Sequence, residues 1–174
     1  MAPVFFLLIF AILEMSLVLR QYLGITSATR ATARTASAVG NDADADHAVL
    51  TEFEKLFKTV DRSEIEYMIV FKPSGPEVDL DTTAALAACK VSSVAGLCNR
   101  YVASDVDRPA ADFGCGGGSP DRFWCPSTRE VALTGPPDFI GIYVKSRYRA
   151  ITGIVGQSYD LTDQVIFRVE PRER

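Results

Sequence analysis

The chain has 174 residues, of which 48% are apolar and 23% charged, with four cysteines, one histidine and a formal net charge of -4. This length suits one ordinary domain, and the apolar fraction excludes a chain that is disordered throughout. Because 22 acidic residues outnumber 18 basic ones, composition disfavours a general nucleic-acid binder, which would carry a basic excess.

The first predicted element is an apolar helix at the start of the chain. Residues 2–19 contain one ionisable side chain, Glu14, and the first cation is Arg20. Extended to Leu23, the segment is long enough to cross a bilayer core, which takes about 20 residues. We interpret residues 1–23 as a retained transmembrane helix.

A cleaved signal peptide and a buried core helix are the two alternatives. A signal peptide needs a basic start and a small-residue cleavage site close behind its apolar core. The first three residues are not basic, and the best such site, residues 36–38, lies too far downstream. So much unbroken apolar surface also exceeds what one soluble helix usually buries.

Residues 24–40 are rich in alanine, threonine and serine and lack proline, so the helix is predicted to continue as a stalk. Small side chains recur at alternating steps of four and three residues along one helical face. They are Gly24, Ala28, Ala31, Thr35 and Ala38. This face permits close approach of another helix, or the stalk lies on its own domain, and both interpretations stay open. Gly40 predicts the end of the helix.

Residues 41–174 are predicted to form an α+β head. One short helix is expected from His47 to about Thr59, capped by Asp46, and Asp81 is expected to cap a brief alanine-rich helix that runs to about Cys89. Alternating apolar residues predict strands, which are residues 64–72, 139–149 and 161–169. The last two strands are expected to be antiparallel neighbours in a small sheet.

The four cysteines lie in the irregular middle third of the chain, at Cys89, Cys98, Cys115 and Cys125. An even count in a loop-rich region behind a membrane helix indicates two disulfides formed outside the cytoplasm. The gaps between the cysteines are too long for a structural zinc site, whose paired ligands are about two to four residues apart. Among the three connectivities we favour the local one, Cys89 with Cys98 and Cys115 with Cys125.

The charges around the predicted membrane helix conflict with this location. Arg20, Arg30 and Arg34 follow an uncharged start, which by the positive-inside rule would place the head in the cytoplasm. Disulfides require the opposite side. We give the cysteines precedence and expect a single-pass protein of the plasma membrane whose C-terminal head lies outside the cytoplasm.

Candidate catalytic and metal-binding groups are few. His47 is the only histidine and is expected to be exposed. Asp42, Asp44 and Asp46 have the spacing of a calcium loop, but positions six and twelve of that frame are His47 and Phe53 instead of glycine and glutamate. We interpret these aspartates as acids at a helix N-terminus, and we predict no catalytic residue, no metal and no cofactor.

Glu14 is the one carboxylate within the predicted transmembrane helix. A charge at that depth is costly and usually functional, so we expect it to pair with a cation or amine of a partner. The alternatives are a shallow helix, from which Glu14 reaches the interface, and neutralisation by protonation.

Several segments, taken in order, resemble the TadE/TadG-like minor pilins, or pseudopilins, of tight adherence (Flp) pili. They are the apolar run to Leu13 with Glu14 and the small-residue helix 20–39, the segments 98–101 and 124–126 with Arg129, and the closing segments 143–149 and 165–171. They are similar, respectively, to the family's membrane helix and stalk, to its cysteine-bearing members, and to its closing strands and terminal Glu-Pro. Family members usually begin with a basic leader cleaved after a glycine, so we expect Met1 to be an internal start; the alternative is a member that is not processed.

The resemblance implies a non-enzymatic assembly protein, whose partners are other pilin subunits and the inner-membrane assembly platform, with no nucleic acid and no small-molecule substrate. It also implies that Glu14 and the small-residue face pack with other pilin helices, and that the protein is incorporated in the pilus. The alternative from another class is a membrane-anchored extracytoplasmic binding module that uses the loop 89–126. A third is a secreted enzyme that uses the acidic cluster near Asp42.

Overall fold

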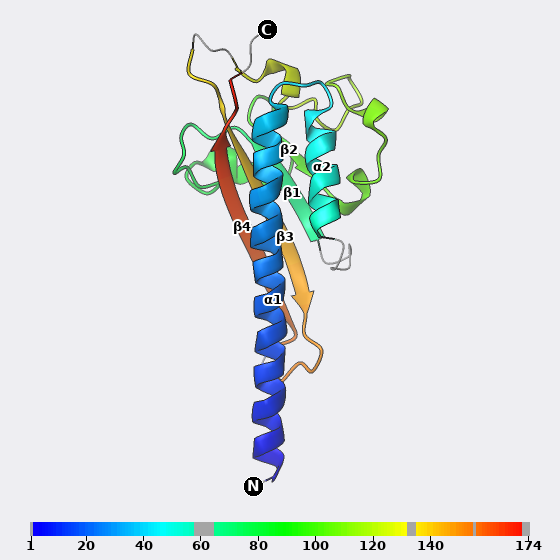
Figure 1. The fold of residues 1–174 in the computed structure, drawn as a ribbon, viewed down its shortest axis with the longest axis vertical. Coiled ribbons are helices and arrows are strands. Elements are labelled where there is room, and N and C mark those ends of the chain that lie inside the picture. Colours follow the sequence, from blue (N-terminus) through cyan, green and yellow to red (C-terminus); the bar gives the residue numbers. More distant parts are fainter. Residues whose placement is uncertain (1, 58–64, 132–134, 155, 172–174) are drawn as a thin grey trace.

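The computed structural model describes residues 2–57, 65–131, 135–154 and 156–171. A long helix projects from a head that is built of a sheet and short helices (Figure 1). The elements are α1 (Ala2–Val39), α2 (Ala45–Leu56), β1 (Ile65–Phe71), α3 (Ala84–Ala87), β2 (Cys98–Tyr101), β3 (Phe139–Arg149) and β4 (Ser158–Arg168), with 3-10 turns η2 (Ala88–Lys90), η3 (Ala103–Asp105), η4 (Ala110–Asp112) and η5 (Pro126–Thr128). The predicted α+β class, a long N-terminal helix followed by a small antiparallel sheet, is confirmed.

The sheet has four strands in the order β2-β1-β3-β4, and all neighbours are antiparallel. The β3–β4 hairpin is its longest pairing and runs from Phe139 opposite Arg168 to Arg149 opposite Ser158. β4 therefore begins three residues before the predicted Leu161. β2 was not predicted, because four residues are too few for an alternating pattern. It exists through its pairing with β1, which places it at the sheet edge.

Two predicted helix caps are wrong. α2 begins at Ala45 with Asp44 in the cap position, so Asp46 lies inside the helix. α3 is capped by Thr83, whose side-chain oxygen accepts a hydrogen bond from the Leu86 N–H. The predicted cap Asp81 instead pairs with Lys90. The predicted helix end near Thr59 and the first predicted strand residue, Glu64, lie outside the described residues.

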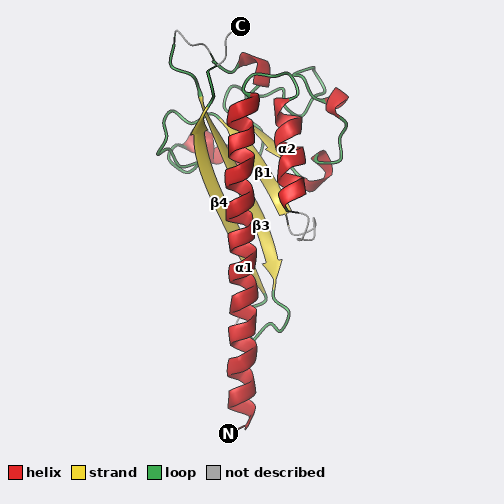
Figure 2. Cartoon of the chain, in the orientation of Figure 1, coloured by secondary structure: helices red, strands yellow, loops and turns green. Residues whose placement is uncertain are grey.

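Both faces of the sheet are covered. One face packs against α1 and α2 (Figure 2) through buried side chains that include Met68, Val70, Ile140, Ile142 and Val144. The opposite face packs against the segment between β1 and β2, where Leu80, Leu86 and Cys89 cover the side chains of Tyr67, Ile69, Phe71 and Tyr143. Cys89 is joined there to Cys98 of β2. Alternation along each strand therefore separates two apolar clusters rather than one core and one wetted face.

The two halves of α1 have different surroundings. Apolar residues from Val4 to Leu19 are largely exposed, whereas Ile25, Ala33 and Ala36 are fully buried against the head. The helix ends at Val39, as predicted, and Gly40 adopts φ +56°, which glycine tolerates without strain. At this end the Ser37 carbonyl accepts a hydrogen bond from the Glu170 N–H, which links the C-terminal segment after β4 to α1.

Gly141 provides a test of the packing between β1 and β3. A Cβ atom at this position would lie 2.3 Å from the ring of Phe71, which is its cross-strand partner. Gly141→Ala is therefore expected to lower the free energy of unfolding by about 1–3 kcal/mol, the usual cost of overpacking. Chemical denaturation of the purified protein would measure the change.

Gly75→Ala is the matched control, because nothing lies within 4 Å of a Cβ atom there. Adding Phe71→Leu to Gly141→Ala should recover part of the loss, since the smaller side chain relieves the overlap. Equal stability of the Gly141 and Gly75 variants would contradict the described register.

Candidate functional site

The carboxylate of Glu14 lies between α1 and the turn that joins β3 to β4. Its side chain is buried, with 1% of the residue exposed. It accepts hydrogen bonds from the backbone N–H groups of Ile151 and Thr152, both at 2.8 Å, and from the Thr152 hydroxyl at 2.6 Å. The Tyr148 hydroxyl is 3.5 Å from the same carboxylate. Glu14 is thus satisfied by neutral donors of its own chain.

These donors were not foreseen from the sequence, because the turn lies 137 and 138 residues away. The sequence did indicate a turn at this place, because Gly153 lies in the connector between the two strands, and this glycine has φ +66° in the structure. Nothing in the turn's composition indicates that its N–H groups face a carboxylate. A contact between Glu14 and another subunit remains a prediction.

The predicted small-residue face lies at one edge of the surface by which α1 contacts the head. Ala28 is buried, Ala31, Thr35 and Ala38 are half-buried, and Gly24 is exposed. The centre of the buried surface instead contains Ile25, Thr29, Thr32, Ala33 and Ala36. The stalk therefore lies on its own domain, which is one of the two open interpretations. Gly24 stays accessible, since nothing lies within 4 Å of a Cβ placed there.

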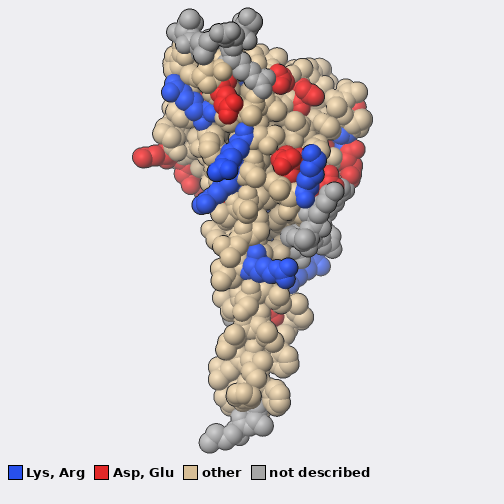
Figure 3. All heavy atoms as spheres, in the orientation of Figure 1, with Lys and Arg blue, Asp and Glu red and all other residues tan. Residues whose placement is uncertain are grey.

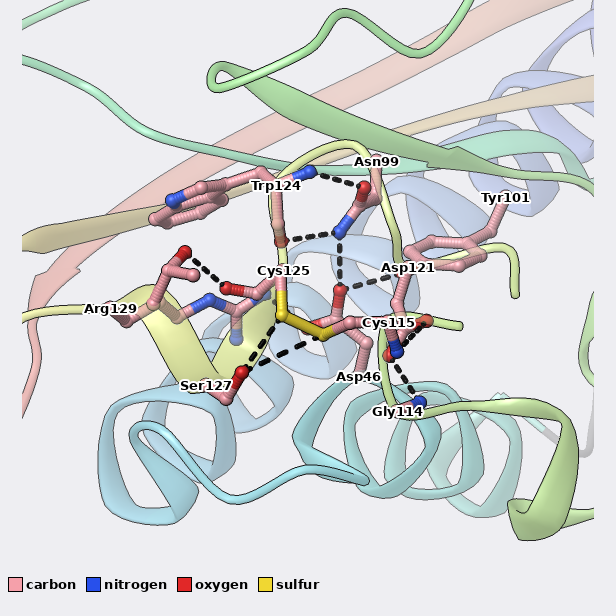
Figure 4. Close-up of a disulfide and its surroundings, with 11 residues drawn as sticks. Asp46, Asn99, Tyr101, Gly114, Cys115, Asp121, Trp124, Cys125, Ser127 and Arg129 are labelled. Carbon is pink, nitrogen blue, oxygen red and sulfur yellow. Dashed lines mark hydrogen bonds and ion pairs between the residues drawn. A yellow bond between two sulfur atoms is a disulfide. The ribbon is translucent and has the colours of Figure 1, made fainter. Parts of the chain in front are cut away.

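The four cysteines form two disulfides, Cys89–Cys98 and Cys115–Cys125, which is the local pairing favoured from the sequence. The first holds η2 against β2, beneath one face of the sheet. The second closes a loop in which Asp121 accepts hydrogen bonds from the N–H groups of Gly114 and Cys115 (Figure 4).

A buried carboxylate organises the loops beside the second disulfide. Asp46, fully buried on α2, accepts hydrogen bonds from the guanidinium of Arg129, the side-chain amide of Asn99 and the hydroxyl of Tyr101 (Figure 4). Burial, followed by the neighbouring Asp46 charge, raises the pKa of Tyr101 well above its usual value. The phenol therefore serves as a neutral donor.

Arg129 and Asn99 extend this network to Trp124. The side chain of Asn99 donates to the Trp124 carbonyl at 2.8 Å and accepts from the Trp124 N–H at 2.9 Å. The guanidinium of Arg129 stacks 4.5 Å from the indole ring. Asp46 looked like an ordinary acid at a helix start, so its role was missed. Asn99, Tyr101, Trp124 and Arg129 all belong to segments quoted for the family resemblance.

Charged side chains of β1, β3 and β4 also form ion pairs across the sheet. Lys145 and Arg147 of β3 each pair with Glu66 and with Asp160, at 2.8–3.1 Å. Hydrogen bonds from Arg147 and then from Lys145 lower the pKa of Asp160. These pairs are partly exposed, so they contribute little stability individually and mainly favour the register of the three strands.

His47 is half-buried and packs against the ring of Phe113, with 5.2 Å between ring centroids. The expectation that it is exposed is therefore wrong. Within the residues that the structure describes, no group of three or more histidine, cysteine, aspartate or glutamate side chains could hold a metal ion.

One helix, Pro3–Val39, is long and apolar enough to cross a membrane, and only 11% of its most apolar 18-residue window is buried. This exposure distinguishes the helix from a buried core helix and suggests a membrane anchor. The fold therefore defines a class, that of α+β proteins whose exposed apolar N-terminal helix runs into a sheet-bearing head.

The family model for TadE-like proteins matches residues 1–34. This match supports assignment of the chain to the TadE-like pilin family, as expected from the sequence, and suggests involvement in the Tad pilus. It covers the apolar half of α1 and part of the half that packs on the head. A comparison with curated proteins and one with solved structures each gave no match.

The Asp46 network predicts a large effect of a single truncation. Asp46→Ala is expected to destabilise the head by about 3–5 kcal/mol, because it leaves the buried Arg129 charge without its carboxylate. Thermal unfolding of the oxidised protein would measure the loss. Asp44→Ala is the control, since Asp44 is exposed and makes no side-chain cap bond. Similar effects of the two substitutions would argue against the network as the organiser of these loops.

Two neighbouring aspartates of β4 are predicted to respond to pH with opposite signs. Burial raises the pKa of Asp163, which faces Thr29 and Arg30 of α1, above its usual 3.8. Its ionised form therefore costs stability, which falls as pH rises through the raised pKa. Asp163→Asn should be more stable than the wild type at neutral pH, and this difference should vanish in acid.

Asp160 supplies the contrasting case, because its pKa is lowered. It contributes stability above an unfolded pKa of 3.8, and this contribution is lost as pH falls through its folded pKa. Asp160→Asn should thus be slightly less stable than the wild type at neutral pH. Melting temperatures of both variants across the acid range would check the signs, and a shared sign would contradict the assigned environments.

Proposed function

We propose that this protein is a non-enzymatic minor pilin or pseudopilin-like subunit that takes part in assembly of a tight adherence pilus. Its partners would be other pilin subunits and the assembly platform of the inner membrane. The observation that carries the proposal is the TadE-like match to residues 1–34, which falls on a helix exposed around its apolar half and built into the head along its other half. The TadE-like pilus family is not a family of enzymes.

The exposed half of α1 fits two successive environments. Val4, Phe5 and Phe6 follow one another at steps of about 100° around the helix, and each is more than half exposed. Such a surface is stable in lipid before assembly and among neighbouring apolar helices in a fibre. We divide the chain accordingly into a transmembrane segment (1–23), a stalk (24–40) and an extracytoplasmic head (41–174).

The continuity of α1 supports a mechanical role. The helix has 38 residues without a break, or about 57 Å at 1.5 Å per residue. Because residues beyond Ile25 belong to the core of the head, a displacement of the apolar half moves the head as well. Extraction of the helix from the membrane would thus carry the head into the fibre.

The two disulfides support a head outside the cytoplasm. Cytosolic thiols are normally kept reduced, whereas extracytoplasmic proteins retain such bonds. The bonds join residues nine and ten positions apart, and each limits the freedom of the unfolded chain. The head is therefore expected to survive outside the cell.

Deletion of the gene tests the proposal directly. We expect loss of surface pili by electron microscopy and of sedimentable pilin, with recovery when the wild-type gene is supplied on a plasmid. Normal piliation of the deletion strain would overturn the proposed function.

A substitution at Gly24 separates assembly from folding. Gly24→Leu is expected to raise the free energy of unfolding by at most about 1 kcal/mol, because there is open space around that position and leucine favours a helix more than glycine does. It is expected to reduce piliation by hindering close helix approach. Tyr22→Trp is the control, since it adds bulk at an exposed residue that is two positions from Gly24 and therefore on the opposite side of α1. Equal piliation in the two strains would remove Gly24 from the assembly surface.

A further inference from the structure

The turn between β3 and β4 contacts α1 at a point where the helix residues on both sides, toward the N-terminus and toward the head, are apolar. It meets the helix at Glu14, and the exposed apolar residues of α1 continue past this point to Leu19. If α1 is surrounded by lipid up to its first cation, Arg20, the turn must lie beside lipid as well. Arg20 follows Glu14 by six residues, or about 9 Å along the helix.

The side chains of the turn suit that location. Ile151 is 75% exposed and Ile154 is 44% exposed, although a water-facing turn usually carries polar residues. Residues 150–157 contain no ionisable side chain, and Arg149 is the first cation on β3 above them. The cations nearest to Glu14 on both elements, Arg20 and Arg149, therefore lie on the same side of the carboxylate, toward the head. In Figure 3 no Lys or Arg is visible on the described surface below the lowest blue patch.

Four backbone N–H groups of the turn have hydrogen-bond partners within the protein. The N–H groups of Ile151 and Thr152 are bonded to Glu14, the Ala150 N–H to the Gln157 carbonyl, and the Ile154 N–H to the Thr152 hydroxyl oxygen. Backbone groups at membrane depth need such partners, because lipid offers none.

The same hydrogen bonds offset the free-energy cost of placing the Glu14 carboxylate in lipid. An isolated carboxylate in lipid is strongly unfavourable, but three hydrogen bonds from Ile151 and Thr152 offset the loss of its water. The carboxylate and the turn are each costly in lipid alone and are mutually satisfied together.

We propose that the β3–β4 turn is a second membrane-contacting element, which enters the lipid beside α1 with Ile151 and Ile154 facing the acyl chains and is held there by Glu14. Lipid is the occupant because this apolar surface continues that of α1, and because Arg20 and Arg149, both exposed, lie where anionic head groups would lie. The inference rests on the proposed membrane anchoring of α1.

Fluorescence quenching in lipid vesicles tests whether the β3–β4 turn contacts lipid. Single cysteines replace Ile154, Leu8 and Val91 in the full chain, which has no free cysteine among the described residues, and each is labelled with NBD without reduction. The proteins are reconstituted at low density in phosphatidylcholine–phosphatidylglycerol vesicles. Doxyl-labelled lipid reports contact with acyl chains, and iodide reports contact with water. Leu8 is the membrane reference, and Val91, 82% exposed on the head, is the aqueous reference.

We expect the label at Ile154 to be quenched by doxyl lipid about as strongly as that at Leu8, and by iodide severalfold less than that at Val91. Quenching at Leu8 with iodide access at Ile154 would overturn the inference and leave the anchoring intact. Protection from iodide at Ile154 without doxyl quenching would overturn it in favour of a second copy as the cover. Iodide access at Leu8 would overturn the anchoring and the inference together.

The role of Glu14 has a separate readout. With the label at Ile154, Glu14→Ala should raise iodide quenching toward the Val91 level, whereas Ser16→Ala should not. Thr152→Val removes one donor to the carboxylate and should raise quenching in part, while Thr152→Ser keeps the hydroxyl and should not. Unchanged protection in both the Glu14 and the Thr152→Val proteins would overturn the holding role.

Discussion

The contact of residues 25–40 of α1 with one face of the sheet is the constraint on which the rest of the structure depends. It makes one continuous helix serve as an exposed apolar rod and as a core element of the head. Small side chains such as Ala33 and Ala36 let the helix lie close to the strands. Since a helix is stiff, the position of the head relative to the exposed half is fixed without any linker between them.

Two buried carboxylates position the segments that the contact between α1 and the sheet does not hold. One accepts hydrogen bonds from neutral groups and the other pairs with a cation. Glu14 accepts only neutral donors, which ties the far end of the β3–β4 hairpin to α1. Asp46 pairs with a cation and draws α2, β2 and the loop closed by Cys115 and Cys125 together. A buried charge without partners is costly. Each carboxylate therefore favours the single arrangement in which its donors converge.

The elements that were predictable are those whose signal is local. β1 and β3 show alternation over their own length, and α1 shows an unbroken apolar run followed by a glycine stop. β2 has no such signal, because its four residues become a strand only beside β1. The same reasoning explains the wrong cap at Asp46, since a carboxylate near a helix start is usually a cap. Only the distant Arg129 and Asn99 make it a core residue.

The sequence by itself determined the apolar helix, the α+β class and the oxidised state expected of the cysteines, because these follow from hydrophobicity, periodicity and cysteine spacing. It also identified Glu14 as a residue that needs partners. Only the tertiary structure decided that those partners are in the β3–β4 turn, and that the small-residue stalk lies on its own head. The reason is physical. Hydrogen bonds and close packing depend on which distant segments come into contact, and the spacing of residues along the chain does not indicate those contacts.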